Sequence, residues 1–177
     1  STPRRSGTLR VVLEIPQSVH AEMIGHAILG LPDEACGLFA GAFGGDRVER
    51  FFPMTNAAKS SQIYELDGQE MMHVERTADD SGVAIIGVMH SHTHMMNYPS
   101  PTDVADAARF DPFGAWRFII VSLQHADASL RSYHILDGEI TERGDTKTVG
   151  DYEVSGLFDV KFDHHNQFGS EEDEADV

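Results

Sequence analysis

Residues 83–103 read VAIIGVMHSHTHMMNYPSPTD, and this stretch decides how the rest of the chain is interpreted. The apolar run at residues 83–89 has the length and composition of a buried β-strand. Ser100, Pro101 and Asp103 are typical of a helix start, with serine as the N-cap, proline at the first helical position and an acidic residue at the third. The polar segment between them therefore follows the carboxyl end of a buried strand, where ligand sites of α/β domains prefer to lie.

Outward from this stretch, the apolar pattern predicts further elements on both sides. We expect strands at residues 8–15, 35–40, 48–52, 63–66, 116–123 and 130–136, the second and third of these forming a hairpin. Two more helices are expected, one beginning at Pro16 and one capped by Asp67 and ending near Thr77. In the first, apolar residues recur at intervals of four: Val19, Met23, Ala27 and Leu31. Strands that alternate with helices predict the α/β class, as a single domain with a mixed β-sheet flanked by helices.

Length and charge set the domain organisation. A chain of 177 residues suits one domain, which we place at residues 8–150. The 29 acidic and 13 basic side chains give a net charge of -16, which repels a phosphate backbone and argues against nucleic acid as a partner. Residues 151–177 hold nine of the acids and one base, and we interpret them as an acidic C-terminal extension that is partly disordered. His164 and His165 within it are expected to be exposed rather than metal ligands.

The apolar and cysteine content indicates the compartment. Cys36 is the only cysteine, so the chain has no internal disulfide and no cysteine-rich zinc site, and this residue is expected to be a buried filler. No run approaches the ~18 apolar residues of a membrane helix. The N-terminal ten residues lack the apolar core of a signal peptide. We expect a cytoplasmic protein without a membrane partner.

Two histidines and an aspartate stand out as candidate metal ligands. On a strand, residues i and i+2 point to the same side, so His90 and His92 can direct their imidazoles at one point. Asp103, in the first turn of the following helix, can fold back beside them. Three nitrogen or oxygen ligands with an open fourth position are the ligand set of a catalytic zinc. Two alternatives remain at this point: His94 could replace one of the two histidines, and Asp103 could serve only as a helix-capping residue.

The order and spacing of these residues resemble a known family. The pattern H-x-H-x7-S-x2-D, together with PDEACGL at residues 32–38, is similar to that of the JAMM (MPN+) zinc isopeptidases, which cleave bonds beside the C-terminus of ubiquitin-like proteins. The resemblance implies a cytidine-deaminase-like fold and one Zn²⁺ per chain on His90, His92 and Asp103. It also implies Glu34 as the general base and Ser100 as a hydrogen-bond donor to the oxyanion. Thr93 departs from the pattern, because many members have proline there.

A narrower resemblance concerns the substrate. The segments PDEACGLFAG, RVERFFPMTNAAKS and LRSYHILDGEITE are similar to those of a bacterial subgroup of the family. This subgroup cleaves the peptide bond between the C-terminal Gly-Gly of a ubiquitin-like sulfur carrier and cysteine, and the released cysteine is the product of a biosynthetic route. The resemblance therefore implies a ubiquitin-like sulfur carrier protein as the partner.

Two other functions stay open on the sequence. The first is an isopeptidase that removes a ubiquitin-like tag from proteins, and the second is a non-catalytic MPN scaffold. All five motif positions are intact, which favours catalysis over a scaffold. The identity of the carrier and the oligomeric state, including a homodimer, are left open.

Overall fold

The structure is a computed structural model that describes residues 12–142 and 147–150. These residues form three helices and eight strands. In chain order they are β1 (Glu14–Pro16), α1 (Gln17–Gly30), β2 (Cys36–Gly41), β3 (Arg50–Met54), α2 (Gly68–Asp80), β4 (Ala84–His92), α3 (Pro101–Phe110), β5 (Arg117–Ser122), β6 (Ser129–Leu136), β7 (Glu139–Glu142) and β8 (Lys147–Val149).

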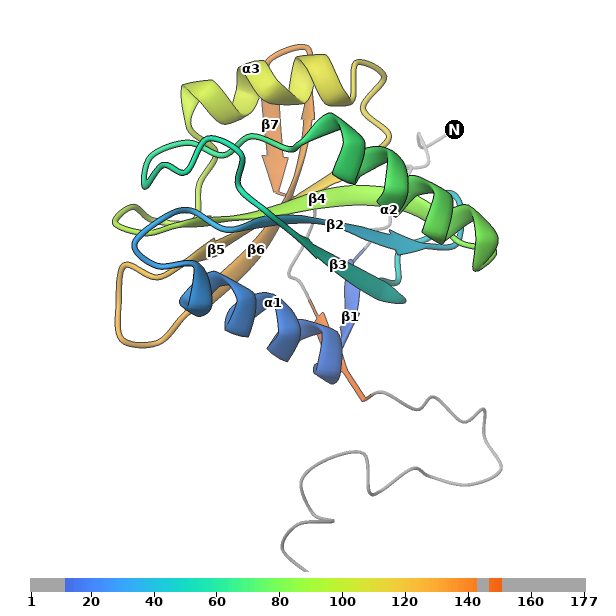
Figure 1. The fold of residues 1–177 in the computed structure, drawn as a ribbon, viewed down its shortest axis with the longest axis horizontal. Coiled ribbons are helices and arrows are strands. Elements are labelled where there is room, and N and C mark those ends of the chain that lie inside the picture. Colours follow the sequence, from blue (N-terminus) through green and yellow to red (C-terminus); the bar gives the residue numbers. More distant parts are fainter. Residues whose placement is uncertain (1–11, 143–146, 151–177) are drawn as a thin grey trace, which may run out of the picture.

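The main sheet is mixed and lies between two layers of helices. Its strand order is β3-β2-β4-β5-β6-β7, in which β4 and β5 run parallel and the other neighbours are antiparallel. Helix α1 covers one face, and α2 and α3 cover the other (Figure 1). Strands β1 and β8 form a separate parallel pair. The mixed sheet flanked by helices confirms the expected α/β architecture.

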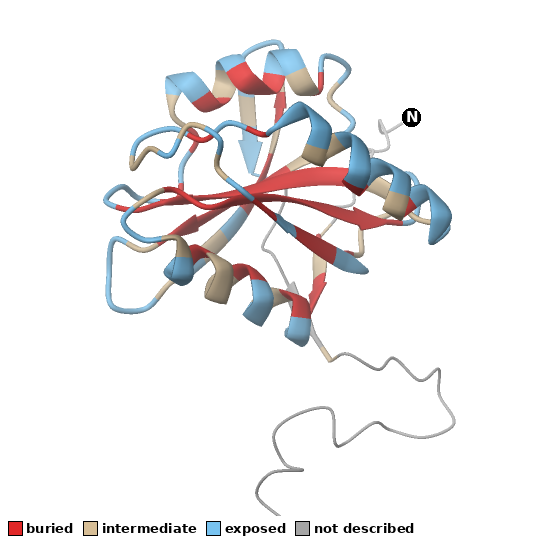
Figure 2. Ribbon diagram, viewed as in Figure 1, coloured by how far each residue is buried: buried red, intermediate tan, exposed pale blue. Residues whose placement is uncertain are grey.

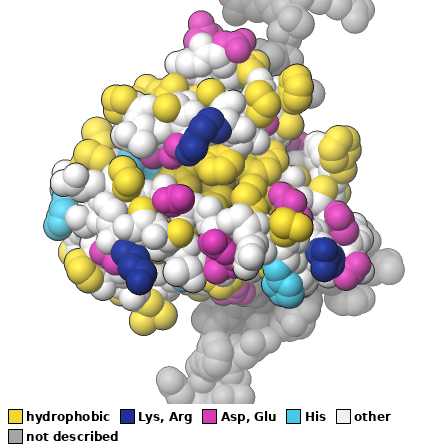
Figure 3. Space-filling model, turned by 45° about the horizontal axis from the view of Figure 1, so that its top comes forward, with side chains coloured by type: hydrophobic (Ala, Val, Ile, Leu, Met, Phe, Trp, Pro, Cys, Tyr) yellow, Lys and Arg dark blue, Asp and Glu magenta, His cyan; other side chains and the backbone are white. Residues whose placement is uncertain are grey.

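The two central strands are buried on both faces of the sheet (Figure 2). Because successive side chains of a strand point to opposite faces, Val88 joins the apolar cluster under α2 and α3, whereas Met89 joins the cluster under α1. The same alternation places His90 and His92 on the α3 side. Figure 3 turns this side forward and shows apolar side chains near its centre with acidic side chains scattered around them.

Most of the expected elements are confirmed, with small shifts at their ends. The hairpin of β2 and β3 forms, Asp67 caps α2, and Ser100 caps α3 with Pro101 at its start. Helix α1 begins directly after Pro16 and buries the stripe Val19, Met23 and Ala27. The expected strand at residues 8–15 is confirmed only at Glu14 and Ile15, since Val12 and Leu13 are not in a strand and residues 8–11 lie outside the described residues. The acidic extension at residues 151–177, with His164 and His165, lies outside them.

Two expectations about the fold are wrong, and one strand of the main sheet was missed. Leu31 does not extend the buried stripe of α1, because the helix ends at Gly30 and Leu31 is 48% exposed. Residues 63–66 do not form a strand, because the side chain of Asn56 accepts a hydrogen bond from Glu65 N and donates one to Ile63 O in place of a strand ladder. Strand β7 was not expected, because three of its four side chains are exposed and give no apolar signal.

Within the described residues, no helix has both the length and the apolar character needed to cross a membrane.

Candidate metal centre

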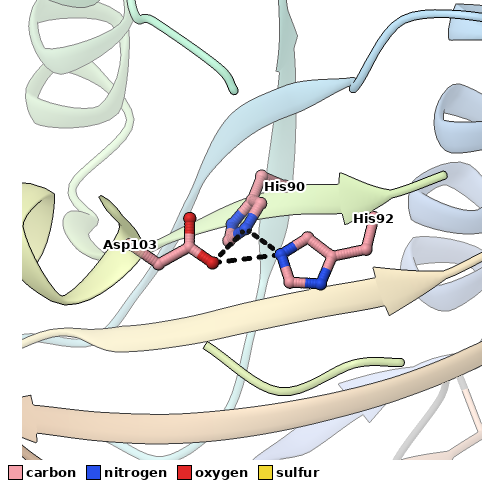
Figure 4. A group of neighbouring side chains, drawn as sticks. All are labelled: His90, His92 and Asp103. Atoms are coloured by element: carbon pink, nitrogen blue, oxygen red, sulfur yellow. Dashed lines mark hydrogen bonds and ion pairs between the residues drawn. The ribbon is translucent and has the colours of Figure 1, made fainter. Parts of the chain in front are cut away.

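The end of strand β4 brings two buried imidazoles together. His90 and His92 are each 1% exposed, and their Nε2 atoms lie 3.1 Å apart. Asp103 Oδ2 lies 3.2 Å from His90 Nε2 and 3.0 Å from His92 Nε2 (Figure 4). Strand β4 is longer than the apolar run predicts and includes both histidines, so their shared direction follows from strand geometry.

Helix α3 fixes the position of Asp103. Ser100 Oγ accepts a hydrogen bond from Asp103 N, and Ser100 N donates one to Asp103 Oδ2, which makes a complete capping box. The carboxylate that caps the helix is therefore the same one that faces the two imidazoles. The helix cap therefore does not remove Asp103 from the candidate ligand set, because its Oδ2 accepts from Ser100 N and also lies beside both imidazoles.

His94 is not part of this group. Its side chain is exposed, and the three residues whose ligand atoms all lie within 4.8 Å of one another are His90, His92 and Asp103. Strand β4 ends at His92, so the alternation that aligns the first two histidines does not continue to the third. Of the three histidines in the HxHxH motif, the structure therefore groups His90 and His92, and not His94, with Asp103.

The donor set fits a divalent metal ion. His92 Nδ1 lies 2.8 Å from the carbonyl oxygen of Met96, and because a carbonyl can only accept, Nδ1 carries the hydrogen and Nε2 presents its lone pair to the centre. Three acceptor atoms at ~3 Å repel one another unless a proton or a cation lies between them. Two imidazole nitrogens and one carboxylate oxygen are a set that catalytic zinc sites use, with a further position open to water or substrate.

The charges of the group act strongly on one another. Burial alone would raise the pKa of Asp103. When protons rather than a cation lie within the group, the charge of His90 and hydrogen bonds from the protonated imidazoles outweigh burial and hold this pKa well below its usual range. Burial would lower the pKa of His92, but its hydrogen bond to Asp103 reverses the direction and raises it. Asp103 is therefore ionised at neutral pH, as a metal ligand must be.

Glu34 lies beside the metal centre, in the segment that leads from α1 into β2. The carboxylate is 3% exposed and lines a cleft of about 320 Å³ together with Ser61, Gln62, Thr93, His94 and Met95. The pKa of Glu34 is raised to about 8, mainly by burial, while the nearby charge of His92 opposes the shift and that of Asp103 adds to it. A carboxyl group that takes up and releases a proton near neutral pH suits general acid and base chemistry.

Backbone and side-chain hydrogen bonds tie the Glu34 segment to β4. Ala35 N donates to Ser91 Oγ at 2.8 Å, and Ser91 N donates to Ala35 O at 2.9 Å. Ser91 stands between the two candidate ligands in sequence, and its side chain points to the opposite side. One residue of β4 thus sets the position of Glu34 relative to His90 and His92. Nothing in the sequence around Ser91 indicates this role, because it depends on the pairing of two segments that lie 56 positions apart.

Cys36 is a buried filler, as expected. It is fully buried, and its thiol lies 3.5 Å from Thr55 O. Burial raises its pKa to about 12, with smaller contributions from the charges of Glu70 and Glu34. A thiol in this state is a poor nucleophile and a poor metal ligand, because both roles require the thiolate.

A ring next to the metal centre was also missed from the sequence. Tyr64 stacks on His90 with the ring centroids 4.4 Å apart and an angle of 21° between the planes. In the sequence, Tyr64 is one aromatic residue within the strand expected at residues 63–66, and such a pattern does not indicate what the ring contacts.

Comparison with known proteins agrees with this geometry. The model of the prokaryotic homologues of the JAB domain matches residues 16–136, which include Glu34 and all three candidate ligands. The chain belongs to the prokaryotic JAB-domain family. The resemblance to JAMM isopeptidases that the motif indicates is thereby confirmed.

Among relatives of this JAB-domain chain, the CysO-cysteine peptidase of Mycobacterium tuberculosis is 42% identical over 139 residues, which cover 78% of this chain and 92% of the relative. A probable TtuB-protein conjugate cleaving protease of Thermus thermophilus is 29% identical over 98 residues, covering 55% of this chain and 64% of the relative. This similarity to curated peptidases identifies the chain as a peptidase, a hydrolase.

Solved structures show the same fold. A protein from Desulfitobacterium hafniense superimposes with a TM-score of 0.68 and 28% identity, covering 86% of this chain and 99% of the other. A JAB1/MPN domain protein from Archaeoglobus fulgidus gives a TM-score of 0.51 at 21% identity, covering 77% of this chain and 98% of the other. The second likeness supports the fold alone.

Proposed function

We propose that this JAB-domain peptidase is zinc-dependent and hydrolyses the peptide bond between the C-terminal Gly-Gly of a ubiquitin-like sulfur carrier protein and cysteine. The observation that carries the proposal is the 42% identity to the CysO-cysteine peptidase over 92% of that relative's length. The buried group of His90, His92 and Asp103, with Glu34 in the adjoining cleft, supplies the residues that such a hydrolysis needs.

The metal would be held by His90 Nε2, His92 Nε2 and Asp103 Oδ2. A zinc ion supplies Lewis-acid activation of water and of the scissile carbonyl when it is bound. Glu34 takes the proton of the attacking water and gives it to the departing amine of cysteine. Its pKa of about 8 suits both directions of transfer near neutral pH.

Ser100 stabilises the oxyanion of the tetrahedral intermediate. Its Oγ accepts a hydrogen bond from Asp103 N, so the hydroxyl hydrogen remains available for donation to the substrate carbonyl oxygen. The capping box that orients Asp103 also fixes the rotamer of Ser100. One turn of helix therefore places a candidate ligand and a candidate oxyanion donor together.

The cleft suits an extended tail without side chains. Besides Glu34, its lining comes from two segments, Ser61 with Gln62 and Thr93 to Met95, and Thr93 Oγ1 donates to Ser61 O at 3.1 Å to join them. Glycine residues can pass close to such a lining because they carry no side chain. Main-chain hydrogen bonds would then supply affinity, as in other modes of extended-peptide recognition.

A second candidate is an isopeptidase that removes a ubiquitin-like tag from proteins. It is favoured by the similarity to the conjugate cleaving protease of Thermus thermophilus and to a desampylase of Haloferax volcanii, which is 33% identical over 73 residues. These matches cover 55% and 41% of this chain, against 78% for the cysteine peptidase. We therefore place this candidate second.

Product analysis separates the two candidates. The purified protein is incubated with a carrier that ends in Gly-Gly-Cys and, separately, with the same carrier joined through Gly-Gly to a protein lysine. Intact masses are then recorded over time. The proposal expects loss of one cysteine residue from the first substrate and slower cleavage of the second. Cleavage of the lysine conjugate alone would overturn the proposal in favour of the isopeptidase.

We further propose a cytoplasmic location, which the single buried thiol of Cys36 supports because no disulfide is required for the fold. The domain at residues 8–150 and an acidic extension beyond it remain part of this proposal.

A further inference from the structure

The two candidate histidine ligands are held in different ways. His92 is oriented by a hydrogen bond, since its Nδ1 donates to the carbonyl oxygen of Met96. His90 Nδ1 is buried and has no hydrogen-bond partner among the described residues. Instead, the ring of Tyr64 lies against the imidazole of His90, with centroids 4.4 Å apart and planes 21° from parallel. The histidine that lacks an orienting hydrogen bond is thus the one that carries a stacked ring.

Tyr64 is itself firmly placed. It is 6% exposed and belongs to the apolar cluster under α2 and α3. Both of its chain neighbours are bound by one side chain, because Asn56 Nδ2 donates to Ile63 O and Asn56 Oδ1 accepts from Glu65 N, each at 3.0 Å. Asn56 Nδ2 also lies 3.0 Å from Glu34 O. The segment that carries the ring is therefore anchored to the same side chain as the segment that carries Glu34.

We propose that Tyr64 is a positioning residue for the metal centre, whose ring holds the imidazole of His90 in the plane that directs Nε2 at His92 and Asp103. An imidazole without a partner on Nδ1 can turn about its bond to Cβ, and a half turn would put the carbon Cε1 in the place of Nε2. The stacked ring opposes tilting of the imidazole, and the close packing around it restricts the turn. Groups that orient metal ligands without touching the metal commonly change metal affinity by 10- to 100-fold.

This inference rests on the metal site of the proposed function, and its test measures metal binding rather than turnover. The affinity for Zn²⁺ is measured by competition with a chelator for the wild type, Tyr64→Phe and Tyr64→Leu. We expect Tyr64→Leu to bind Zn²⁺ about 10-fold more weakly or worse, and Tyr64→Phe, which keeps the ring, to stay within about threefold of the wild type. The visible spectrum of bound Co²⁺, which reports ligand geometry, should change in Tyr64→Leu and not in Tyr64→Phe.

A matched control separates positioning from general destabilisation. Leu66→Ala removes a buried side chain of the same cluster that touches neither histidine in any described contact, so it should lower the melting temperature without changing Zn²⁺ affinity. Should Tyr64→Leu not fold, Tyr64→Met keeps most of the volume and provides the same comparison. Equal Zn²⁺ affinity in the wild type and the ring-free variant would overturn the role of Tyr64 alone. A wild-type protein that binds no Zn²⁺ would overturn the metal site and this inference together.

Discussion

Within residues 90–103, the side chains at the two ends are buried, whereas several side chains in the middle are exposed. At the ends, strand β4 and helix α3 bury His90, His92 and Asp103. In the middle, Met95, Met96 and Tyr98 are 47%, 65% and 52% exposed. We refer to these three exposed side chains as the rim. The candidate ligands are fixed by regular secondary structure, whereas the rim lies on a loop that faces solvent.

The loop is nevertheless held in place, through its backbone. His92 Nδ1, Ser122 Oγ and Tyr133 OH donate to three successive carbonyl oxygens of the loop, those of Met96, Met95 and Asn97 respectively. Such contacts do not depend on which side chains the loop carries. We therefore expect that the side chains of the rim can change, and with them what the rim recognises, without disturbing the candidate metal centre.

The largest effect is expected from removal of a ligand. His92→Ala should lose most of its zinc and all measurable hydrolysis, because two remaining ligands bind the metal far more weakly. Elemental analysis of the purified variant checks the first point and an activity assay the second. Met96→Ala serves as the control on the rim, since it keeps the backbone carbonyl that accepts from His92. Loss of zinc in Met96→Ala equal to that in His92→Ala would contradict the expectation that the rim can change without disturbing the candidate metal centre.

The second-largest effect is expected from replacement of Glu34, the candidate general base. Glu34→Gln should retain zinc and the fold but lower kcat by about 10²- to 10⁴-fold, because an amide keeps the shape of the side chain and cannot accept the proton. Metal content and kcat are measured on the same preparation, with Glu34→Asp as a variant that keeps the carboxylate at a shorter reach. Turnover of Glu34→Gln close to that of the wild type would refute the assignment.

A smaller effect is expected at the helix cap. Ser100→Ala should lower kcat by roughly 10²-fold through loss of the oxyanion donor. It should also lower stability by about 1 kcal/mol through loss of the N-cap. Zinc should remain bound, because Ser100 N still donates to Asp103 Oδ2. Ser100→Thr keeps the hydroxyl and is the control; if it were as slow as Ser100→Ala, a hydroxyl donor would not be the cause.

The smallest effect in this series is on the stability of the metal-free protein. The folded pKa of Glu34, about 8, lies above its usual value of 4.5, so its ionisation opposes folding. The resulting loss of stability is absent below pH ~4.5, grows as the pH rises and reaches its full size above pH ~8. A shift of this size corresponds to at most about 5 kcal/mol, and solvent in the adjoining cleft screens part of it. Metal-free Glu34→Gln should therefore be more stable than the metal-free wild type by about 2 kcal/mol at pH 8.5, and this difference in stability should shrink towards pH 5. Denaturant unfolding at the two pH values measures the free energy of unfolding of each protein. A difference between variant and wild type that is the same at both pH values would contradict the burial of an ionisable carboxyl group at position 34.

The sequence predicts the ligand side of the site better than its surroundings. His90, His92 and Asp103 follow from two local rules, the alternation of a strand and the first turn of a capped helix. Tyr64 and Ser91 act through contacts across 26 and 56 positions of the chain, and neither residue carries a local signal of what it touches. Long-range packing of this kind becomes visible only when the segments are placed together.

The same reason accounts for the errors in the fold. The strand expected at residues 63–66 has suitable side chains, but Asn56 satisfies its backbone groups instead of a neighbouring strand. Strand β7 lies at the edge of the sheet, with Tyr133 opposite Glu142, and its exposed polar residues resemble a loop in sequence. Strand β5, which is buried on both faces, agrees with the expected bounds to within one residue at each end. Strand β4 extends three residues beyond its expected end at Met89, because its last residues are polar side chains of the candidate metal centre rather than apolar ones.

Recognition of the carrier is tested most directly by comparing kcat/KM for two substrates that contain the same scissile bond. One is the intact carrier ending in Gly-Gly-Cys, and the other is the same terminal peptide detached from its carrier. The ligands and Glu34 act on both alike, whereas only the carrier can engage surfaces beyond the cleft. We predict that kcat/KM for the intact carrier is at least about 100-fold higher, a difference that corresponds to about 2.7 kcal/mol. Equal values would contradict carrier recognition, and release of cysteine from neither substrate would contradict the proposed reaction itself.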